Sequence, residues 1–377
     1  MLDYKLELLQ PNFDSKLTDL IIEFEKLRYT ELKGTTPPHL LHELRYILHS
    51  LESINSSRIE GNQTTVIEYM ESQISKSDQN NLNIREILNI EEVILFISKL
   101  SSEDIVINRM FVSEIHKRVV AGLTTEGSGT PGVYRNKNIK ISQSKHTPPD
   151  YSQVSSYMDK LYEFISNNDE SKYDPIKIAI AHHYFTWVHP FDNGNGRTVR
   201  ILTYALLVKY KFITNFRMVN PTATFCSNRG DYYSALSSAD SLTQEGKNIW
   251  CQYMLGGLIE STQKILMLCD YSLLNKRIIQ PTLKKALLRA FISQDEAAIL
   301  HFLSLKHFAK FSDLSIVLKS KNNSQSYHSR VIAKMLRNDL IVPIKERGRV
   351  YTLKLKNKHL MSSLIDSFRA EGLLHID

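Results

Sequence analysis

The sequence contains few cysteines, glycines and prolines, and each shortage excludes a class of protein. Among its 377 residues are 3 cysteines, 14 glycines and 11 prolines. So few helix-breaking residues exclude a collagen-like or linker-rich chain and favour helix. Cys226, Cys251 and Cys269 are odd in number and lack the spacing of a metal site, which argues against a disulfide framework and a structural zinc site. We therefore expect a cytoplasmic protein.

Long apolar runs are also missing. No stretch approaches the roughly 18 apolar residues that span a bilayer, so no membrane partner is expected. The first residues, MLDYKLELLQP, carry charge in each turn, unlike a signal peptide. With 42% hydrophobic and 23% charged residues, the chain fits a folded globular protein of roughly two to three domains.

Positive charge is concentrated in the last quarter of the chain. The whole chain has a net charge of +7, whereas residues 277–377 hold 18 Lys and Arg against 8 Asp and Glu. The preceding residues therefore carry a small negative net charge. Two interpretations fit this asymmetry: a separate C-terminal module with an anionic partner, or a solvated lysine-rich surface.

Apolar residues recur at helical spacing through most of the chain. We expect helices over residues 14–34, 40–54, 66–74, 84–100, 104–121, 151–167, 175–187, 194–210, 229–242 and 249–275. A polar, turn-rich stretch follows the second of these helices. Residues 127–149 contain several breakers around the alternating Ile139 and Ile141, which predict a short strand in a β-hairpin or an extended flap.

The pattern changes from about residue 293. Short helices are expected over 293–303, 311–318 and 324–340, followed by strands at 341–344 and 350–353. This order resembles a winged helix-turn-helix. The basic residues that could contact DNA phosphates are Arg330, Lys334 and Arg337 on the third helix and Lys345, Arg347 and Arg349 on the wing. Winged helices also bind proteins, so DNA is one of two possible partners.

The most informative segment is HPFDNGNGRTVR, residues 189–200. An apolar helix stops at Pro190, a glycine-rich turn follows, and a second apolar helix begins. Backbone N–H groups at a helix N-terminus, with Arg197 and Arg200 in the first turn, form an anion site suited to phosphates. His189 precedes this site and can act as a general base. The arrangement predicts phosphoryl or nucleotidyl transfer; a polar helix corner capped by histidine is the alternative.

These residues resemble the signature of the Fic (Fic/Doc, Fido) family, whose members transfer AMP from ATP to a hydroxyl side chain of a target protein. Residues 132–149 resemble the family's target-docking hairpin, and RGDYY at 229–233 is similar to its adenine-facing tyrosine pair. The resemblance covers about residues 105–250. It implies a mainly α fold: a Fic-type helical core with a β-hairpin flap, to which this chain adds the C-terminal winged helix-turn-helix.

The resemblance also implies roles for individual residues. His189 would take the proton from an acceptor Ser, Thr or Tyr, whose oxygen would attack the α-phosphorus of ATP. Phe191 would anchor the loop in the core. The residues implied in ATP binding are Gly194, Asn195, Gly196, Arg197, Thr198, Arg200, Tyr232, Tyr233, Ile139, Lys140 and Ile141. The implied cofactors are ATP and Mg²⁺.

One position departs from the family pattern. Relatives usually have Asp or Glu just before Gly194, where it holds Mg²⁺, but this chain has Asn193. An amide oxygen binds Mg²⁺ more weakly than a carboxylate. Asp192 lies one position early and is expected to point elsewhere. The metal affinity and the choice of nucleotide therefore stay open.

A second motif, SSRIEG at residues 56–61, resembles the family's inhibitory motif Ser/Thr-x-x-x-Glu-Gly/Asn. It implies that Ser56 and Glu60 belong to an intramolecular brake. Glu60 would pair with Arg200 in place of the γ-phosphate, because a carboxylate can substitute for a phosphate on a guanidinium. The alternative is an ordinary surface glutamate before a turn.

Three other residues near the signature have weaker assignments. His182 and His183 are expected to pack or form hydrogen bonds, because no acidic residue lies in register for a metal site. Asp240 lies where relatives present an asparagine to adenine.

The expected protein is a cytoplasmic adenylyltransferase that modifies a target protein and itself. Its expected units are an N-terminal helical region with the inhibitory motif (1–104), a Fic catalytic core (105–250), a connecting helix (251–285) and a winged-helix module (286–377). A homodimer is compatible with the sequence. The rivals are a DNA-binding regulator with weak or lost transferase activity, and a transferase of another nucleotide or of a phosphoryl group.

Overall fold

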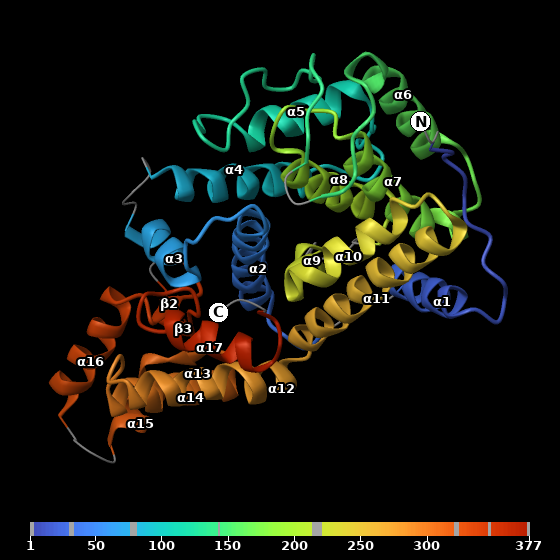
Figure 1. Ribbon diagram of the computed structural model, residues 1–377. Coiled ribbons are helices and arrows are strands. Elements are labelled where there is room, and N and C mark those ends of the chain that lie inside the picture. The colour runs from blue at the N-terminus through green and yellow to red at the C-terminus, as the bar shows by residue number, and fades with distance from the viewer. Residues whose placement is uncertain are drawn as a thin grey trace.

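The computed structural model describes residues 4–29, 34–75, 81–141, 144–212, 221–319, 324–345 and 348–374. The chain is mainly helical and has one small antiparallel sheet, as Figure 1 shows. The mainly α fold expected from the sequence is therefore confirmed. None of the helices in these ranges is long and apolar enough to cross a bilayer.

The helices of the N-terminal and central parts are α1 (Lys16–Arg28), α2 (Pro38–Ile59), α3 (Val66–Ser75), α4 (Leu82–Ile97), α5 (Arg109–Val119), α6 (Val154–Ser166), α7 (Asp174–Val188), α8 (Asn195–Lys209), α9 (Pro221–Ser227), α10 (Arg229–Ala239) and α11 (Gln244–Cys269). Short 3-10 turns, η1 (Tyr151–Gln153) and η2 (Ser171–Tyr173), precede α6 and α7. Side-chain caps account for several starts; the Asn108 side chain, for example, accepts a hydrogen bond from Phe111 N at 2.9 Å before α5.

The C-terminal part consists of α12 (Tyr271–Leu274), a π-turn η3 (Asn275–Ile279), α13 (Gln280–Leu288), α14 (Gln294–Lys306), β1 (Ala309–Lys310), α15 (Phe311–Lys319), α16 (Gln325–Arg337), β2 (Ile341–Pro343), β3 (Val350–Leu353) and α17 (Met361–Ala370). The strands form an antiparallel sheet in the order β1-β3-β2. The sequence pattern predicted neither α9 nor α17. Glu346 and Arg347, expected at the tip of the wing, lie outside the described residues.

Helix α2 is longer than its sequence predicted. The expected helix ended at residue 54, but α2 continues to Ile59, so Ser56 lies on the helix rather than in a loop. The polar residues of this end did not mark a turn because several of them are buried against other helices. Ser56 Oγ, for example, accepts a hydrogen bond from Arg200 Nε of α8 at 2.9 Å.

The β-hairpin expected at residues 127–149 is absent from the described part of that segment, which excludes residues 142 and 143. Ile139, Lys140 and Ile141 follow an extended loop without strand partners. Side chains hold the loop instead of a ladder of backbone bonds: Arg135 Nη2 donates to Pro149 O at 2.6 Å and Asn138 Nδ2 to Asp150 Oδ2 at 2.8 Å. The segment therefore has the second expected form, an extended flap.

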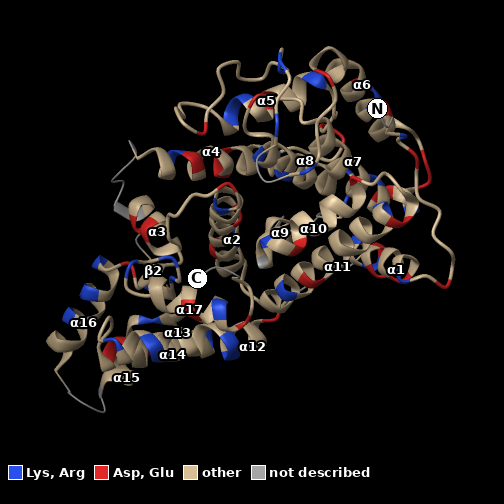
Figure 2. Cartoon of the chain, viewed as in Figure 1, with Lys and Arg blue, Asp and Glu red and all other residues tan. Residues whose placement is uncertain are grey.

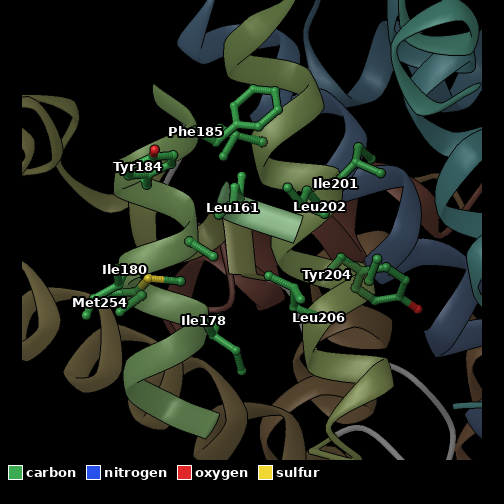
Figure 3. Close-up of a cluster of buried hydrophobic side chains, with 14 of the residues drawn as sticks. Leu161, Ile178, Ile180, Tyr184, Phe185, Ile201, Leu202, Tyr204, Leu206 and Met254 are labelled. Atoms are coloured by element: carbon green, nitrogen blue, oxygen red, sulfur yellow. The ribbon is translucent and has the colours of Figure 1, made fainter. Parts of the chain in front are cut away.

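The buried side chains form two hydrophobic clusters. The first surrounds α7 and α8, which pack on each other; α7 also packs on α6 and α11, and α8 on α4 and α5. Figure 3 shows part of it, with Leu161 of α6, Phe185 of α7, Leu202 of α8 and Met254 of α11. The second cluster joins α2 and α3 to the C-terminal helices α13, α14 and α17. The first cluster holds the signature segment.

Helix α2 contributes to both clusters and stands between α4 and the C-terminal helices in Figure 1. Near its beginning, Glu43 Oε2 accepts hydrogen bonds from the backbone N–H groups of Leu355 and Lys356 at 2.7 and 2.8 Å. Near its end, Ile59 packs in the first cluster. A helix of 22 residues is about 33 Å long, so α2 connects the C-terminal region to the signature segment.

Candidate active site

The signature segment turns sharply between α7 and α8. Helix α7 stops at Val188 because His189 adopts a left-handed conformation, with φ 51° and ψ 63°. Helix α8 starts after Gly194, which has φ 73° and provides no side-chain cap. The N-cap residue therefore offers no side-chain acceptor to the first N–H groups of α8. N–H groups without such a cap can bind an anion at a helix N-terminus.

The imidazole of His189 is neutral and partly exposed beside this turn. Its Nδ1 lies 3.3 Å from Thr186 O, and because a carbonyl can only accept, Nδ1 carries the hydrogen and Nε2 the lone pair. Burial lowers the pKa of His189 to about 4. An unprotonated Nε2 at neutral pH is what a general base requires.

Arg135 of the flap holds the backbone around His189. Its Nε donates to His189 O at 2.9 Å, and its backbone N–H donates to Pro190 O at 2.9 Å. Its Nη2 group also lies within 3.3 Å of Val188 O. A left-handed backbone at a residue other than glycine is costly and needs such support. Arg135 lies in the flap expected from the sequence, but no local pattern indicates this role.

Three signature side chains stabilise the loop itself. The ring of Phe191 is buried, as expected. Asn195 closes the turn, because its Oδ1 accepts from Phe191 N and its Nδ2 donates to Phe191 O, both at 2.9 Å. Thr198 Oγ1 donates to Gly194 O at 2.8 Å and is buried. The side chains of Asn195 and Thr198 thus form hydrogen bonds within the loop, and their expected role in ATP binding stays a prediction.

His116 of α5 packs against the same loop. Its ring stacks on Phe191 with centroids 3.7 Å apart and an angle of 1°. Its Nδ1 accepts from Gly132 N at 2.8 Å, so Nε2 carries the hydrogen and donates to Asn193 O at 3.0 Å. No sequence signal distinguished this histidine from an ordinary helical residue, because its partners lie in two distant loops.

Glu60 lies over the first turn of α8. A Cβ atom added to Gly196 would collide with Glu60 Oε1, so the carboxylate is in contact with the glycine turn. Glu60 Oε1 accepts from Arg200 Nη2 at 2.6 Å. Burial raises the pKa of Glu60, but the nearby guanidinium groups of Arg200 and Arg197 outweigh it and hold the pKa below its usual value. The carboxylate is therefore ionised where an anion would bind.

Ser56 completes this contact from the preceding turn of α2. Its Oγ accepts from Arg200 Nε and its backbone carbonyl from Arg200 Nη2, both at 2.9 Å. The structure thus brings Ser56, Glu60 and Arg200 together, as the resemblance implied. Arg200 is only 2% exposed.

We expected Arg197 to face open space as a phosphate ligand, but its side chain is buried. Its side chain is 1% exposed and pairs with Glu86 of α4, with Arg197 Nη1 2.8 Å from Glu86 Oε1. Its Nη2 donates to Glu126 O at 2.7 Å. A direct contact with phosphate would require Arg197 to give up one of these partners. The sequence did not reveal Glu86, which is 111 positions away from Arg197.

The residues at the expected metal position do not form a metal site. Asn193 Oδ1 accepts from Gly194 N at 2.7 Å, and the Asp192 carboxylate accepts from Ser128 Oγ at 2.6 Å and from Gly129 N at 3.2 Å. Asp192 therefore points away, as expected. Within the described ranges no group of three or more His, Cys, Asp or Glu side chains is arranged to hold a metal ion. These donors do not fit Mg²⁺, which prefers carboxylates together with substrate phosphates.

The expected adenine contacts are only partly accessible. Tyr232 is 2% exposed, and its hydroxyl lies 3.0 Å from His182 Nε2. Its expected contact with adenine stays a prediction. Its neighbour Tyr233 is exposed. Asp240 Oδ1 lies 3.0 Å from His183 Nε2. Helix α10 packs with Tyr232 on its buried side, and Tyr233, the next residue, points to its exposed side.

Sequence comparison identifies relatives of the segment that contains this site. Residues 107–207 match the Fic/DOC family. The chain is 27% identical to Protein adenylyltransferase Fic of Nematostella vectensis over 237 residues, which are 60% of this chain and 51% of that protein. It is 25% identical to Protein adenylyltransferase fic-1 of Caenorhabditis elegans over 227 residues, 59% of this chain and 41% of that protein. The chain thus spans about half the length of these relatives, or less.

Structural comparison extends the likeness to most of the chain. A crystal structure of a Fic family protein from Desulfovibrio desulfuricans G20 covers 92% of this chain and 98% of its own length, with a TM-score of 0.54 and 19% sequence identity. At that identity the likeness shows a shared fold and nothing more specific.

Proposed function

Because residues 107–207 form a Fic domain, we propose that this protein transfers AMP from ATP to a hydroxyl side chain of a target protein, and to itself, and that Glu60 inhibits the transfer. One observation carries the proposal. A neutral His189 stands beside a helix N-terminus whose anion site is covered by the carboxylate of Glu60 on Arg200. A base next to an anion site is the minimum that nucleotidyl transfer needs.

In the proposed reaction, His189 Nε2 removes the proton from an acceptor hydroxyl. The hydroxyl oxygen bonds to the α-phosphorus of ATP, the bond to the bridging oxygen breaks, and pyrophosphate leaves. Arg135 keeps His189 in its left-handed conformation during this step. The first N–H groups of α8 and the Arg200 guanidinium supply positive charge to the phosphates, because in-line transfer is mainly positioning and charge stabilisation.

The proposed brake is competition for Arg200. Glu60 and the phosphates of ATP would bind the same guanidinium and the same glycine turn, so the ionised carboxylate must leave before ATP binds productively. Neutralising or removing it should release the site. The buried setting strengthens the competition, since a charged pair at 2.6 Å with little solvent is hard to displace.

Labelled ATP tests the proposal. We expect Glu60→Gly to incorporate AMP into itself at least tenfold faster than the natural sequence, with Glu60→Gln intermediate because it keeps the shape and loses the charge. Glu60→Gly combined with His189→Ala is the matched control and should be inactive. Parallel reactions with labelled UTP and GTP test the rival nucleotides, and a preference for either of them, or no incorporation at all, would contradict the proposal.

A second function, binding of duplex DNA by the C-terminal region, is supported by the exposed face of α16. Arg330 and Arg337 are exposed there, and no large apolar side chain is exposed on this helix. Lys334 contributes less, because it pairs with Glu296 Oε1 at 3.0 Å. Figure 2 shows the blue residues of α16 at the outer edge of the molecule.

Fluorescence anisotropy with a labelled duplex at several salt concentrations tests this function. Removing Arg330 and Arg337 together should weaken binding and reduce its salt dependence. Removing two exposed lysines far from α16, Lys16 and Lys99, is the control for net charge. Binding that is absent at low salt, or equally weakened by both double variants, would exclude a DNA site on α16.

A further inference from the structure

The turn that carries Glu60 ends α2 in a compact form. Gly61 has φ 107°, and the backbone N–H groups of Gly61 and Asn62 donate to Arg58 O at 3.0 Å and Ser57 O at 3.1 Å. This is the hydrogen-bond pattern of a Schellman ending, in which a left-handed glycine follows the last helical residues. The position of the Glu60 carboxylate therefore depends on where this turn is held.

One side chain ties the turn to α4. Asn62 is buried, and its Nδ2 donates to Glu86 Oε2 at 2.8 Å and to Asn83 O at 2.9 Å. Its Oδ1 accepts from Thr64 N at 3.0 Å. All its polar atoms are therefore used, and two of its partners belong to the first turns of α4. Figure 2 shows acidic residues where α2 ends against α4.

Glu86 continues this connection into the signature. Its other oxygen, Oε1, accepts from Arg197 Nη1 at 2.8 Å, and both side chains are almost fully buried. Arg197 lies one turn before Arg200 on α8. Arg197 pairs with Glu86, as Arg200 pairs with Glu60, so a carboxylate holds each of the two signature arginines. A continuous path of charged hydrogen bonds runs from Asn62 through Glu86 to the helix that Glu60 covers.

We propose that Asn62 is a positioning residue, which holds the turn of residues 60–62 against Glu86 of α4 and so keeps Glu60 on Arg200. The inference rests on the proposed function, because its effect on activity requires that Glu60 inhibits transfer. It adds a second element to the brake, outside the Glu60–Arg200 contact. A hydrogen bond to a buried carboxylate is among the stronger ones in proteins.

The test is a double-mutant cycle on AMP incorporation. Asn62→Ala should raise self-modification by roughly tenfold, the effect of losing one hydrogen bond to a charged group. Asn62→Asp should do at least as much, because it keeps the acceptor for Thr64 N, loses the donor and places a second carboxylate beside Glu86. In a Glu60→Gly background neither change should raise activity further, because the turn then carries no inhibitor.

Asn81→Ala is the matched control. Asn81 caps α4 by accepting from Asn83 N at 2.9 Å and does not bond to Glu86, so its loss perturbs the same helix end without breaking the proposed contact. It should leave self-modification within about twofold of the natural sequence. A substitution of Glu86 would be a poor test, because Glu86 also neutralises Arg197.

Each outcome bears on the inference. Asn62→Ala with unchanged activity, while Glu60→Gly is strongly activated, would overturn the positioning role and leave the proposed function intact. Lower activity in both backgrounds would assign Asn62 a purely structural role. If Glu60→Gly itself transfers nothing, the proposed function fails, and the inference is then tested by hydrogen exchange. Faster exchange of the backbone amides at positions 61 and 62 in Asn62→Ala supports the inference. Unchanged exchange at both positions contradicts it.

Discussion

The carboxylate of Glu60 lies against the α-carbon of Gly196, so closely that a methyl group on that glycine would overlap Glu60 Oε1. A side chain at position 196 would therefore have to displace the Glu60 carboxylate. The same space is taken by this carboxylate and, in the proposed function, by a phosphate.

Gly196→Ala should therefore separate two effects that Glu60→Gly combines. The methyl group should displace Glu60 from Arg200, and it should also fill the anion site. We expect the ion pair to be broken in a crystal structure of the variant while AMP incorporation stays at least tenfold below that of Glu60→Gly. High activity in Gly196→Ala would show that the glycine turn does not bind phosphate.

The pH dependence of transfer should reflect the depressed pKa of His189. Its pKa of about 4 means that the base is unprotonated at neutral pH and becomes protonated only in acid. The charge of Glu60 raises the pKa of His189, so the Glu60→Gly variant should have a His189 pKa that is lower still. We expect kcat/KM of Glu60→Gly to vary less than twofold from pH 8 to pH 6. A tenfold fall over that interval, following a group near 6.5, would contradict the assignment of His189 as a neutral base with a depressed pKa.

Arg135→Ala should lower kcat more than it changes KM. The guanidinium of Arg135 bonds to the carbonyl oxygens of His189 and Pro149 and does not lie in the anion site. Its loss leaves His189 free to abandon its left-handed backbone, and it should lower the free energy of unfolding by about 2 kcal/mol. Arg135→Lys should restore only part of kcat, because an ammonium cannot reach several carbonyls at once. Steady-state kinetics in the Glu60→Gly background and thermal unfolding measure both effects, and a change confined to KM would argue for direct contact with ATP.

Glu52 of α2 should make stability depend on pH. Burial raises the pKa of Glu52 from 4.5 to about 8, although it accepts a hydrogen bond from Thr222 N at 3.0 Å. A carboxyl whose folded pKa exceeds its unfolded pKa stabilises the fold in acid, and that stabilisation is lost as pH rises towards 8. Relative to Glu52→Gln, the natural sequence should lose at least about 1 kcal/mol between pH 5 and pH 8. Urea unfolding of both proteins at the two pH values provides the comparison, and a pH-independent difference would show that Glu52 does not titrate there.

Local sequence signals located the signature turn and most helices. Pro190 and Gly194 act on the backbone within a few residues, and periodic apolar positions identify buried helix faces, so these elements could be predicted without a structure. The end of α2 could not. Its polar residues look like a loop in sequence, and they continue the helix where Ser56 accepts hydrogen bonds from Arg200 of α8 inside the protein.

The sequence by itself determined the residue types of the site: a histidine, a glycine turn and two arginines within one short segment, and a glutamate in a motif far from it. The tertiary structure alone decided which of them are available. It paired Arg197 with Glu86, buried Tyr232 against His182, and used Arg135 and His116 to support the loop. The physical reason is separation along the chain. A residue's backbone conformation depends mainly on its neighbours, whereas its hydrogen-bond partners and exposure depend on segments that lie, in these contacts, 50 to 111 residues away along the chain.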